Sequence, residues 1–192
     1  MRDKFFVEVG TCDFDTCLPL LENGWKGIMI EPVLEYCLSL REKIPEELKD
    51  NVKILNYAVS DGKYSAVQIA VSDQHNNQEW VRGISHITSD NHLGTKLSEN
   101  VKNSTLYTEG ERIVAALTLD EVFERENVDH VDFLKIDVEG HETNIINSYS
   151  WKIKPTFLKI EHKHVDDIHM KKILVKNGYM VYTERDDIYA IH

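Results

Sequence analysis

The stretch FLKIDVEGHE, residues 133–142, joins a mostly apolar segment directly to three carboxylates, a glycine and a histidine. The segment FLKI has the length and character of a strand inside a parallel sheet, where helices cover both faces. The pattern GHETNIINSYS that follows is typical of a helix. A strand that leads through a charged turn into a helix is the repeating unit of an α/β fold, so this stretch decides the fold class.

The same alternation of strand and helix extends from this stretch toward both ends of the chain. Before it, strand patterns cover residues 4–10, 26–31 and 52–60, and helical patterns cover 15–24, 32–44 and 118–127. After it come a strand at 156–162, a helix at 165–178 and two strands at 179–186 and 187–192, joined by so short a link that they should pair antiparallel. We therefore predict an α/β fold, a Rossmann-like three-layer sandwich whose mainly parallel seven-stranded sheet has a C-terminal antiparallel hairpin strand.

The middle of the chain departs from this alternation. The Asp61-Gly62 dipeptide is a hairpin signal between the strand patterns at 52–60 and 64–72. Residues 72–110 are polar and show no sustained periodicity, and inserts of this length in compact domains are usually lids, binding loops or disordered segments. We expect a single domain over residues 1–192 that carries this insert.

The charge balance and the cysteines narrow the class of protein. The 192 residues include 22 Lys plus Arg against 33 Asp plus Glu, a net charge of -11, and no basic run is long enough to follow a nucleic-acid backbone. The N-terminal residues lack the apolar core of a signal peptide, and no segment approaches the roughly 18 apolar residues of a membrane span. The 3 cysteines, an odd count, favour reduced thiols. We expect a cytoplasmic protein that binds neither nucleic acid nor membranes.

The first strand ends at the place where α/β sheets bind ligands, beyond the carboxyl ends of the strands. Glu8, Gly10 and Thr11 lie there. A dinucleotide requires the pattern G-x-G-x-x-G, of which only Gly10 is present, and Asp13 and Asp15 would repel a pyrophosphate. The loop therefore favours a ligand with a cationic centre, such as S-adenosylmethionine, over a nicotinamide or flavin dinucleotide.

A second carboxylate, Glu31, stands at the end of the strand pattern at 26–31. Carboxylate oxygens only accept hydrogen bonds, so this side chain can take both hydroxyls of a ribose. The competing interpretation is that Glu8 and Glu31 are ordinary exposed charges at strand ends. Their occurrence at successive strand ends favours the cofactor site.

Four segments taken in order, VEVGTCDFDT, GIMIEP, NYAVSD and FLKIDVEGHE, resemble the FkbM-type family of S-adenosylmethionine-dependent methyltransferases. The resemblance covers almost the whole chain apart from the polar insert, and it implies a class I methyltransferase fold. It also implies which residues bind the cofactor: Glu8 and Gly10 in the loop, Glu31 at the ribose, and Asn56, Ala58 and Val59 around the adenine. The first loop departs from the family pattern D-V-G-A-N-x-G, because residues 11–14 read TCDF.

The charged residues after the fourth and fifth strands are candidates for the chemistry. In the resembled fold Asp137 faces the transferred methyl group and the amino-acid end of the cofactor. Asp137 or His162 could act as a general base if the acceptor is a hydroxyl. We expect Glu139 and Glu161 to contact the acceptor, and Glu142 to stabilise the start of the following helix.

Two further groups of residues could bind ligands. In the insert, Trp80, Arg82 and His86 combine an apolar plate, a fixed cation and a titratable ring, and they are candidate acceptor contacts. The segment EHKHVDDIH, residues 161–169, contains possible metal ligands, but its spacing fits no defined zinc pattern. We expect a solvated rim there and no metal.

These observations together predict an S-adenosylmethionine-dependent O-methyltransferase. The acceptor would be a hydroxyl of a sugar, a glycan or a small natural product, a specification that rests on the family resemblance. One alternative is a domain that keeps the nucleoside pocket without turnover, which the atypical first loop permits. A less favoured alternative is a nicotinamide-dependent oxidoreductase.

Overall fold

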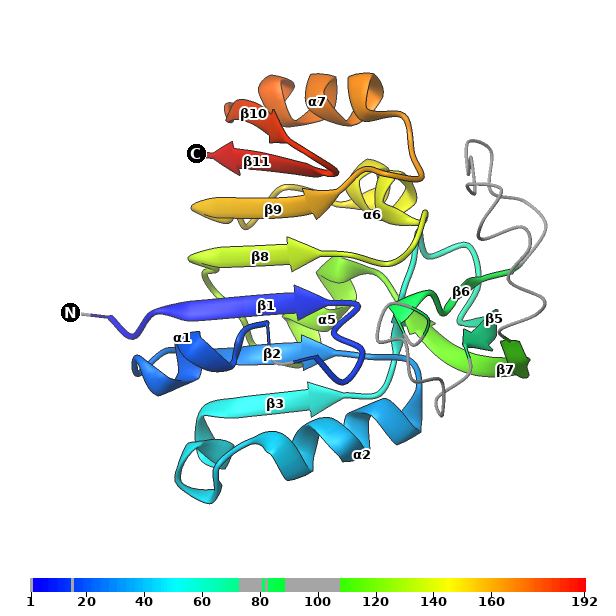
Figure 1. Ribbon diagram of the computed structural model, residues 1–192. Coiled ribbons are helices and arrows are strands. Elements are labelled where there is room, and N and C mark those ends of the chain that lie inside the picture. The colour runs from blue at the N-terminus through cyan, green and yellow to red at the C-terminus, as the bar shows by residue number, and fades with distance from the viewer. Residues whose placement is uncertain (1, 15, 73–80, 82, 89–107) are drawn as a thin grey trace.

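The computed structural model describes residues 2–14, 16–72, 81, 83–88 and 108–192. Its main sheet has seven strands in the order β10-β11-β9-β8-β1-β2-β3 (Figure 1). All neighbours pair in parallel except β11, which is antiparallel to both β9 and β10. The predicted sheet and its antiparallel C-terminal hairpin are confirmed. The strands are β1 (Phe5–Val9), β2 (Lys26–Ile30), β3 (Val52–Leu55), β8 (Phe133–Ile136), β9 (Phe157–Glu161), β10 (Met180–Glu184) and β11 (Asp187–Ile191).

Helices cover both faces of this sheet, as the alternation of side chains along each strand requires. Phe6 packs with buried residues of α1 and α2, whereas Val7 and Val9 pack with those of α5, α6 and α7. Thr118 and Glu121 form a capping box at the start of α5. The helices are α1 (Leu18–Glu22), α2 (Leu34–Lys43), the 3-10 helix η1 (Glu46–Asn51), α5 (Leu119–Arg125), α6 (Glu142–Ser148) and α7 (Asp167–Lys176).

A second, four-stranded sheet lies beyond the carboxyl ends of β1, β2 and β3 (Figure 1). Its order is β4-β7-β5-β6, and its apolar residues form one buried cluster with Cys12 and Tyr36. The second sheet therefore covers the loops that follow β1 and β2. Its strands are β4 (Ala58–Val59), β5 (Ala66–Ser72), β6 (His86–Ile87) and β7 (Thr108–Leu117).

The hairpin predicted across Asp61-Gly62 is wrong. Residues 52–60 divide into β3, in the main sheet, and β4, in the second sheet. Strand β4 pairs in parallel with β7, and β5 pairs antiparallel with β7 rather than with the strand that precedes it. The predicted insert at 72–110 contains β6 and the beginning of β7, so part of it is regular structure. Among the described residues, none of the helices is long and apolar enough to cross a bilayer.

Candidate active site

The loop after β1 lies directly against the end of β8, and Gly10 makes this approach possible. Gly10 has a φ of +79°, and its backbone N–H donates to the Ile30 carbonyl at 3.0 Å. A Cβ at this position would lie 1.7 Å from the backbone oxygen of Asp137. Only glycine fits both the left-handed conformation and the contact. The loops after β1 and β8 therefore meet at one place.

Glu31 joins the loops after β1 and β2. Its Oε2 accepts a hydrogen bond from the Cys12 N–H at 2.7 Å, and its Oε1 accepts one from the Val33 N–H at 2.8 Å. The side chain is buried, and this burial raises the pKa of Glu31 to about 7. A carboxylate has about four acceptor positions, so two remain for a ligand.

A pocket of about 550 Å³, its open mouth included, lies where these loops meet the second sheet. It contains six of the residues that the sequence assigned to the cofactor or acceptor: Gly10, Glu31, Ala58, Val59, His86 and Asp137. The His86 ring is fixed by a contact of 2.9 Å between Nδ1 and the Ile84 carbonyl. Sequence reasoning did not assign the apolar and small residues that complete the wall, because nothing in their local pattern marks them: Val9, Cys12, Ile30, Pro32, Tyr36, Tyr57, Ile69, Gly83, Ser85, Ile87 and Val138.

Three residues predicted to bind the cofactor lie near the pocket without lining it. Glu8 is fully buried on the face covered by α1, and Thr11 is fully buried within the loop after β1. Asn56 donates its side-chain amide to the carbonyls of Glu31 and Pro32, at 3.0 and 2.9 Å, and so holds the loop after β2. A direct role for these three stays a prediction. Trp80 and Arg82 lie outside the described residues.

Lys135 links Glu8 to the site and was not identified from the sequence. Its Nζ lies 3.0 Å from Glu8 Oε1 and 3.4 Å from Asp137 Oδ2. Burial alone would lower the pKa of Lys135, but the carboxylates of Glu8 and Asp137 outweigh this effect and raise the pKa. The lysine therefore stays charged and holds the Asp137 carboxylate from the buried side of the site.

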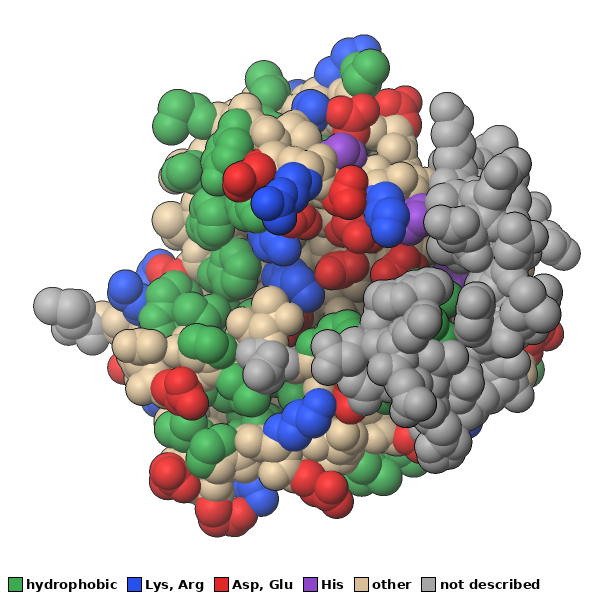
Figure 2. Space-filling model, in the orientation of Figure 1, with side chains coloured by type: hydrophobic (Ala, Val, Ile, Leu, Met, Phe, Trp, Pro, Cys, Tyr) green, Lys and Arg blue, Asp and Glu red, His purple; other side chains and the backbone are tan. Residues whose placement is uncertain are grey.

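Carboxylates gather at the carboxyl ends of β8 and β9, where Figure 2 shows several acidic side chains close together. Asp137, Glu142 and Glu161 bring their oxygens within 4.8 Å of one another. Glu142 is the first residue of α6, as predicted, and accepts hydrogen bonds from the N–H groups of Val138 and Gly140. Burial, with the nearby carboxylates led by Asp137, raises the pKa of Glu161 to about 9.

The two predicted general bases differ in position. Asp137 lines the pocket, and its side chain is 32% exposed. His162 follows β9 and is absent from the described lining. Its backbone N–H donates to the Asp186 carbonyl at 2.8 Å, and its Nε2 is buried with no hydrogen-bond partner in the described part of the chain. The geometry therefore favours Asp137 as the group that reaches a bound reactant.

The chain matches a family model and has similarity to several solved structures. The family model "Methyltransferase FkbM domain" matches residues 8–181. Similar solved structures include precorrin-6y C5,15-methyltransferase from Geobacter metallireducens, with 11% identity, a TM-score of 0.47, and coverage of 100% of this chain and 80% of that chain. A SAM dependent methyltransferase from Aquifex aeolicus has 14% identity and a TM-score of 0.42, with coverage of 98% of this chain and 81% of that chain. The glycopeptide N-methyltransferase MtfA complexed with SAM has 8% identity and a TM-score of 0.44, with coverage of 98% of this chain and 80% of that chain. Identities this low carry no information about the substrate. No curated protein matches the chain.

The family model covers the parts of the chain that build the pocket. Residues 8–181 include the loops after β1 and β2, the second sheet, and the charged turns after β8 and β9. The same range contains the charged turn DVEGHE at 137–142. The chain belongs to the FkbM family of S-adenosylmethionine-dependent methyltransferases.

Proposed function

We propose that this protein transfers a methyl group from S-adenosylmethionine to a hydroxyl of a sugar, a glycan or a small natural product. One observation carries the proposal: a single pocket joins Glu31 at the end of β2, the apolar pair Ala58 and Val59, and Asp137 at the end of β8. These groups match, in order, a ribose, an adenine and a reacting cationic centre. The family membership gives independent support.

The residues of the pocket fit the cofactor. Glu31 retains acceptor positions that face the pocket, suitable for two ribose hydroxyls. Val59 and Ile69 offer an apolar surface for a base. Asp137 offers a carboxylate to the positively charged amino-acid end. When bound, S-adenosylmethionine supplies an electrophilic methyl group.

Methyl transfer requires the acceptor oxygen to approach in line with the breaking carbon–sulfur bond. The oxygen–carbon bond forms as the carbon–sulfur bond breaks, and the hydroxyl proton must pass to a base. Asp137 lies at the pocket with a partly exposed carboxylate and is our candidate for accepting that proton. Lys135 holds this carboxylate from the buried side, so the protein supplies both position and proton acceptor.

Calorimetry with S-adenosylhomocysteine and with NAD tests the choice of cofactor. We expect S-adenosylhomocysteine to bind and NAD to leave no signal. Incubation with a methyl-labelled cofactor and a panel of hydroxylated and aminated metabolites then tests turnover, and label should pass to hydroxylated compounds. Binding of NAD alone would refute the proposal. Binding of S-adenosylhomocysteine without transfer to any of the compounds would favour the non-catalytic nucleoside-binding domain.

Glu31→Gln is expected to weaken S-adenosylhomocysteine binding about tenfold, because a hydrogen bond to a charged acceptor is lost. In the wild type, affinity should fall as the pH falls through about 7, where the buried carboxylate takes up a proton and loses acceptor capacity. Titration calorimetry on both sides of that pH measures both effects. Glu35→Gln, a half-exposed carboxylate on α2, is the matched control and should retain wild-type affinity. A wild-type affinity independent of pH would contradict the assignment.

Asp137→Asn is expected to lower kcat about 100-fold or more, because amide cannot accept the hydroxyl proton. Single-turnover measurements with labelled cofactor and the best acceptor measure the loss, and circular dichroism checks the fold. Asp186→Asn replaces an exposed aspartate between β10 and β11 and should leave kcat unchanged. Unchanged turnover in the Asp137 variant would remove this residue from the mechanism.

A further inference from the structure

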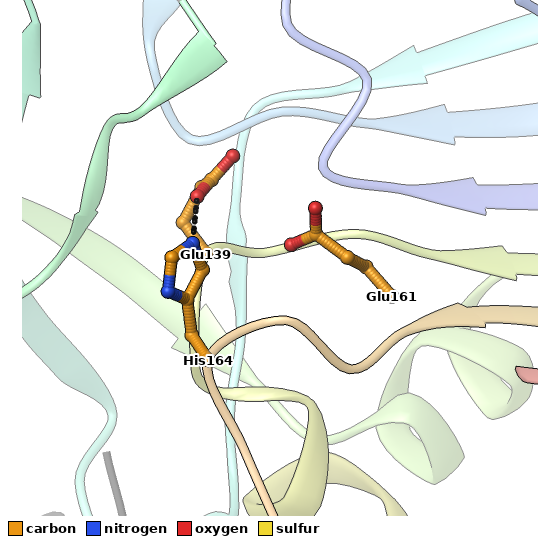
Figure 3. A group of neighbouring side chains, drawn as sticks. All are labelled: Glu139, Glu161 and His164. Carbon is orange, nitrogen blue, oxygen red and sulfur yellow. Dashed lines mark ion pairs between the residues drawn. The ribbon is translucent and has the colours of Figure 1, made fainter. Parts of the chain in front are cut away.

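Three side chains with metal-binding atoms meet beside the pocket. Glu139 belongs to the turn after β8, Glu161 is the last residue of β9, and His164 lies in the loop before α7 (Figure 3). Their ligand atoms all lie within 4.8 Å of one another. Ligands of one divalent ion stand about 2.0–2.6 Å from it, and hence up to about 5 Å apart. The three atoms are therefore close enough together to bind a common ion.

The polar atoms of these side chains are incompletely satisfied. His164 is 1% exposed, and its Nε2 faces Glu139 Oε2 at 3.4 Å. Figure 3 shows the carboxylate of Glu161 pointing toward the other two residues. Within the described part of the chain, Glu161 Oε2 and His164 Nδ1 are buried without a hydrogen-bond partner. Buried polar atoms normally have hydrogen-bond partners, so the unpaired oxygen of Glu161 indicates a ligand bound between the three side chains.

The charges around the three residues favour a cation. Glu161 also lies within 4.8 Å of the carboxylates of Asp137 and Glu142. The ammonium group of the buried Lys135 already pairs with Glu8 and Asp137. Carboxylates this close repel one another in a partly buried site, and a divalent ion would reverse that repulsion.

We propose that Glu139, Glu161 and His164 bind a divalent cation for which carboxylates and an imidazole are suitable ligands, such as Mn²⁺. Three protein ligands leave coordination positions open to water or to an acceptor oxygen. The carboxylate of Glu161 lies within 4.8 Å of that of Asp137, which lines the pocket, so the ion lies next to the pocket. If the proposed function holds, a hydroxyl bound to the ion is positioned for methyl transfer and loses its proton more readily.

The segment at 161–169, where the sequence predicted a solvated rim and no metal, supplies only two of these ligands, Glu161 and His164. The Asp166 carboxylate caps α7 by accepting hydrogen bonds from the N–H groups of Ile168 and His169. The His169 ring contacts the Asn147 side chain at 3.0 Å. The ligands come instead from two strand ends, a combination that spacing along one segment does not reveal.

Electron paramagnetic resonance of Mn²⁺ tests the site without any assay of activity. Wild-type protein freed of metal by chelation and then titrated with Mn²⁺ should remove the free-ion signal in a saturable manner. Glu161→Gln and Glu139→Gln should each weaken Mn²⁺ binding about 100-fold. Glu184→Gln, at the exposed end of β10, makes the same charge change away from the site and should bind as the wild type does.

Several outcomes would overturn the metal site. Wild-type protein that binds none of Mn²⁺, Mg²⁺ and Zn²⁺ refutes it, whatever the variants do. Equal binding by the wild type and a folded Glu139→Gln variant also refutes it; the Glu139 side chain is partly exposed. Calorimetry with S-adenosylhomocysteine on the same metal-free protein keeps the two proposals separate. Cofactor binding without Mn²⁺ binding sinks the metal site alone, whereas loss of cofactor binding sinks the proposed function.

Discussion

Gly10→Ala is expected to lower the free energy of unfolding by about 3 kcal/mol or more and to abolish S-adenosylhomocysteine binding. The added Cβ would lie 1.7 Å from the backbone oxygen of Asp137, so one of the two chain segments must move. A φ of +79° adds the usual penalty for a side chain in the left-handed region. Movement of either segment separates Glu31 from Asp137, because the loop of Gly10 lies between them.

Gly24→Ala isolates the contribution of the close contact. Gly24 has a φ of +80°, almost the same as Gly10, but a Cβ there would meet nothing within 4 Å. The conformational penalty alone, about 1 kcal/mol, is expected. Urea denaturation of both variants, monitored by circular dichroism, measures the difference between their free energies of unfolding. Equal destabilisation of the two variants would show that the loop after β1 does not rest on β8.

The main sheet could be predicted because each of its strands can be recognised from its own residues. In a sheet covered on both faces, each strand is a short apolar run, and FFVEV, KGIMI and FLKI are such runs. Alternation with helices then dictates parallel pairing, and the short link between β10 and β11 dictates the antiparallel exception. The strands of the second sheet do not alternate with helices in this way. Strand β4 has 2 residues, and the residues of β7 that pair with it, Ala116 and Leu117, follow only after the insert.

The roles of the two carboxylates could not be separated by their residue types. Glu31 follows the last residue of β2 and reaches the pocket, whereas Glu8 lies inside β1, opposite Lys135 of β8 in the sheet register. A shift of one or two positions along a strand changes the face or the end to which a side chain belongs. Predicting the Glu8–Lys135 pair needed that register, which the sequence does not contain.

The cluster at β8 and β9 shows the same limit. The sequence placed charged residues after both strands, and the structure brings those strand ends together. It could not say that His164, two residues beyond the predicted base His162, would face Glu139. The path of the loop after β9 decides which histidine turns inward, and nothing in its composition distinguishes the two.

Lys135→Met is expected to lower the free energy of unfolding by about 3–5 kcal/mol, because it leaves Glu8 buried without its cation. Glu8 is fully buried and Lys135 nearly so, hence solvent cannot replace the lost partner. Urea denaturation measures the effect. Lys159 provides a matched control, since it stands opposite Lys135 on β9 and pairs with Asp187 at 3.0 Å while remaining 28% exposed. Lys159→Met should cost less than about 1 kcal/mol.

The double variant Glu8→Leu/Lys135→Met distinguishes a buried charge from lost packing. With both charges removed, most of the stability lost in Lys135→Met should return, because an apolar pair of similar volume replaces a buried ion pair at little cost. Asp137 would then lack its contact at 3.4 Å, so turnover should stay low although the fold recovers. Recovery of stability and turnover together would mean that Lys135 serves the fold alone. Failure of stability to recover would assign its effect to packing against neighbouring side chains.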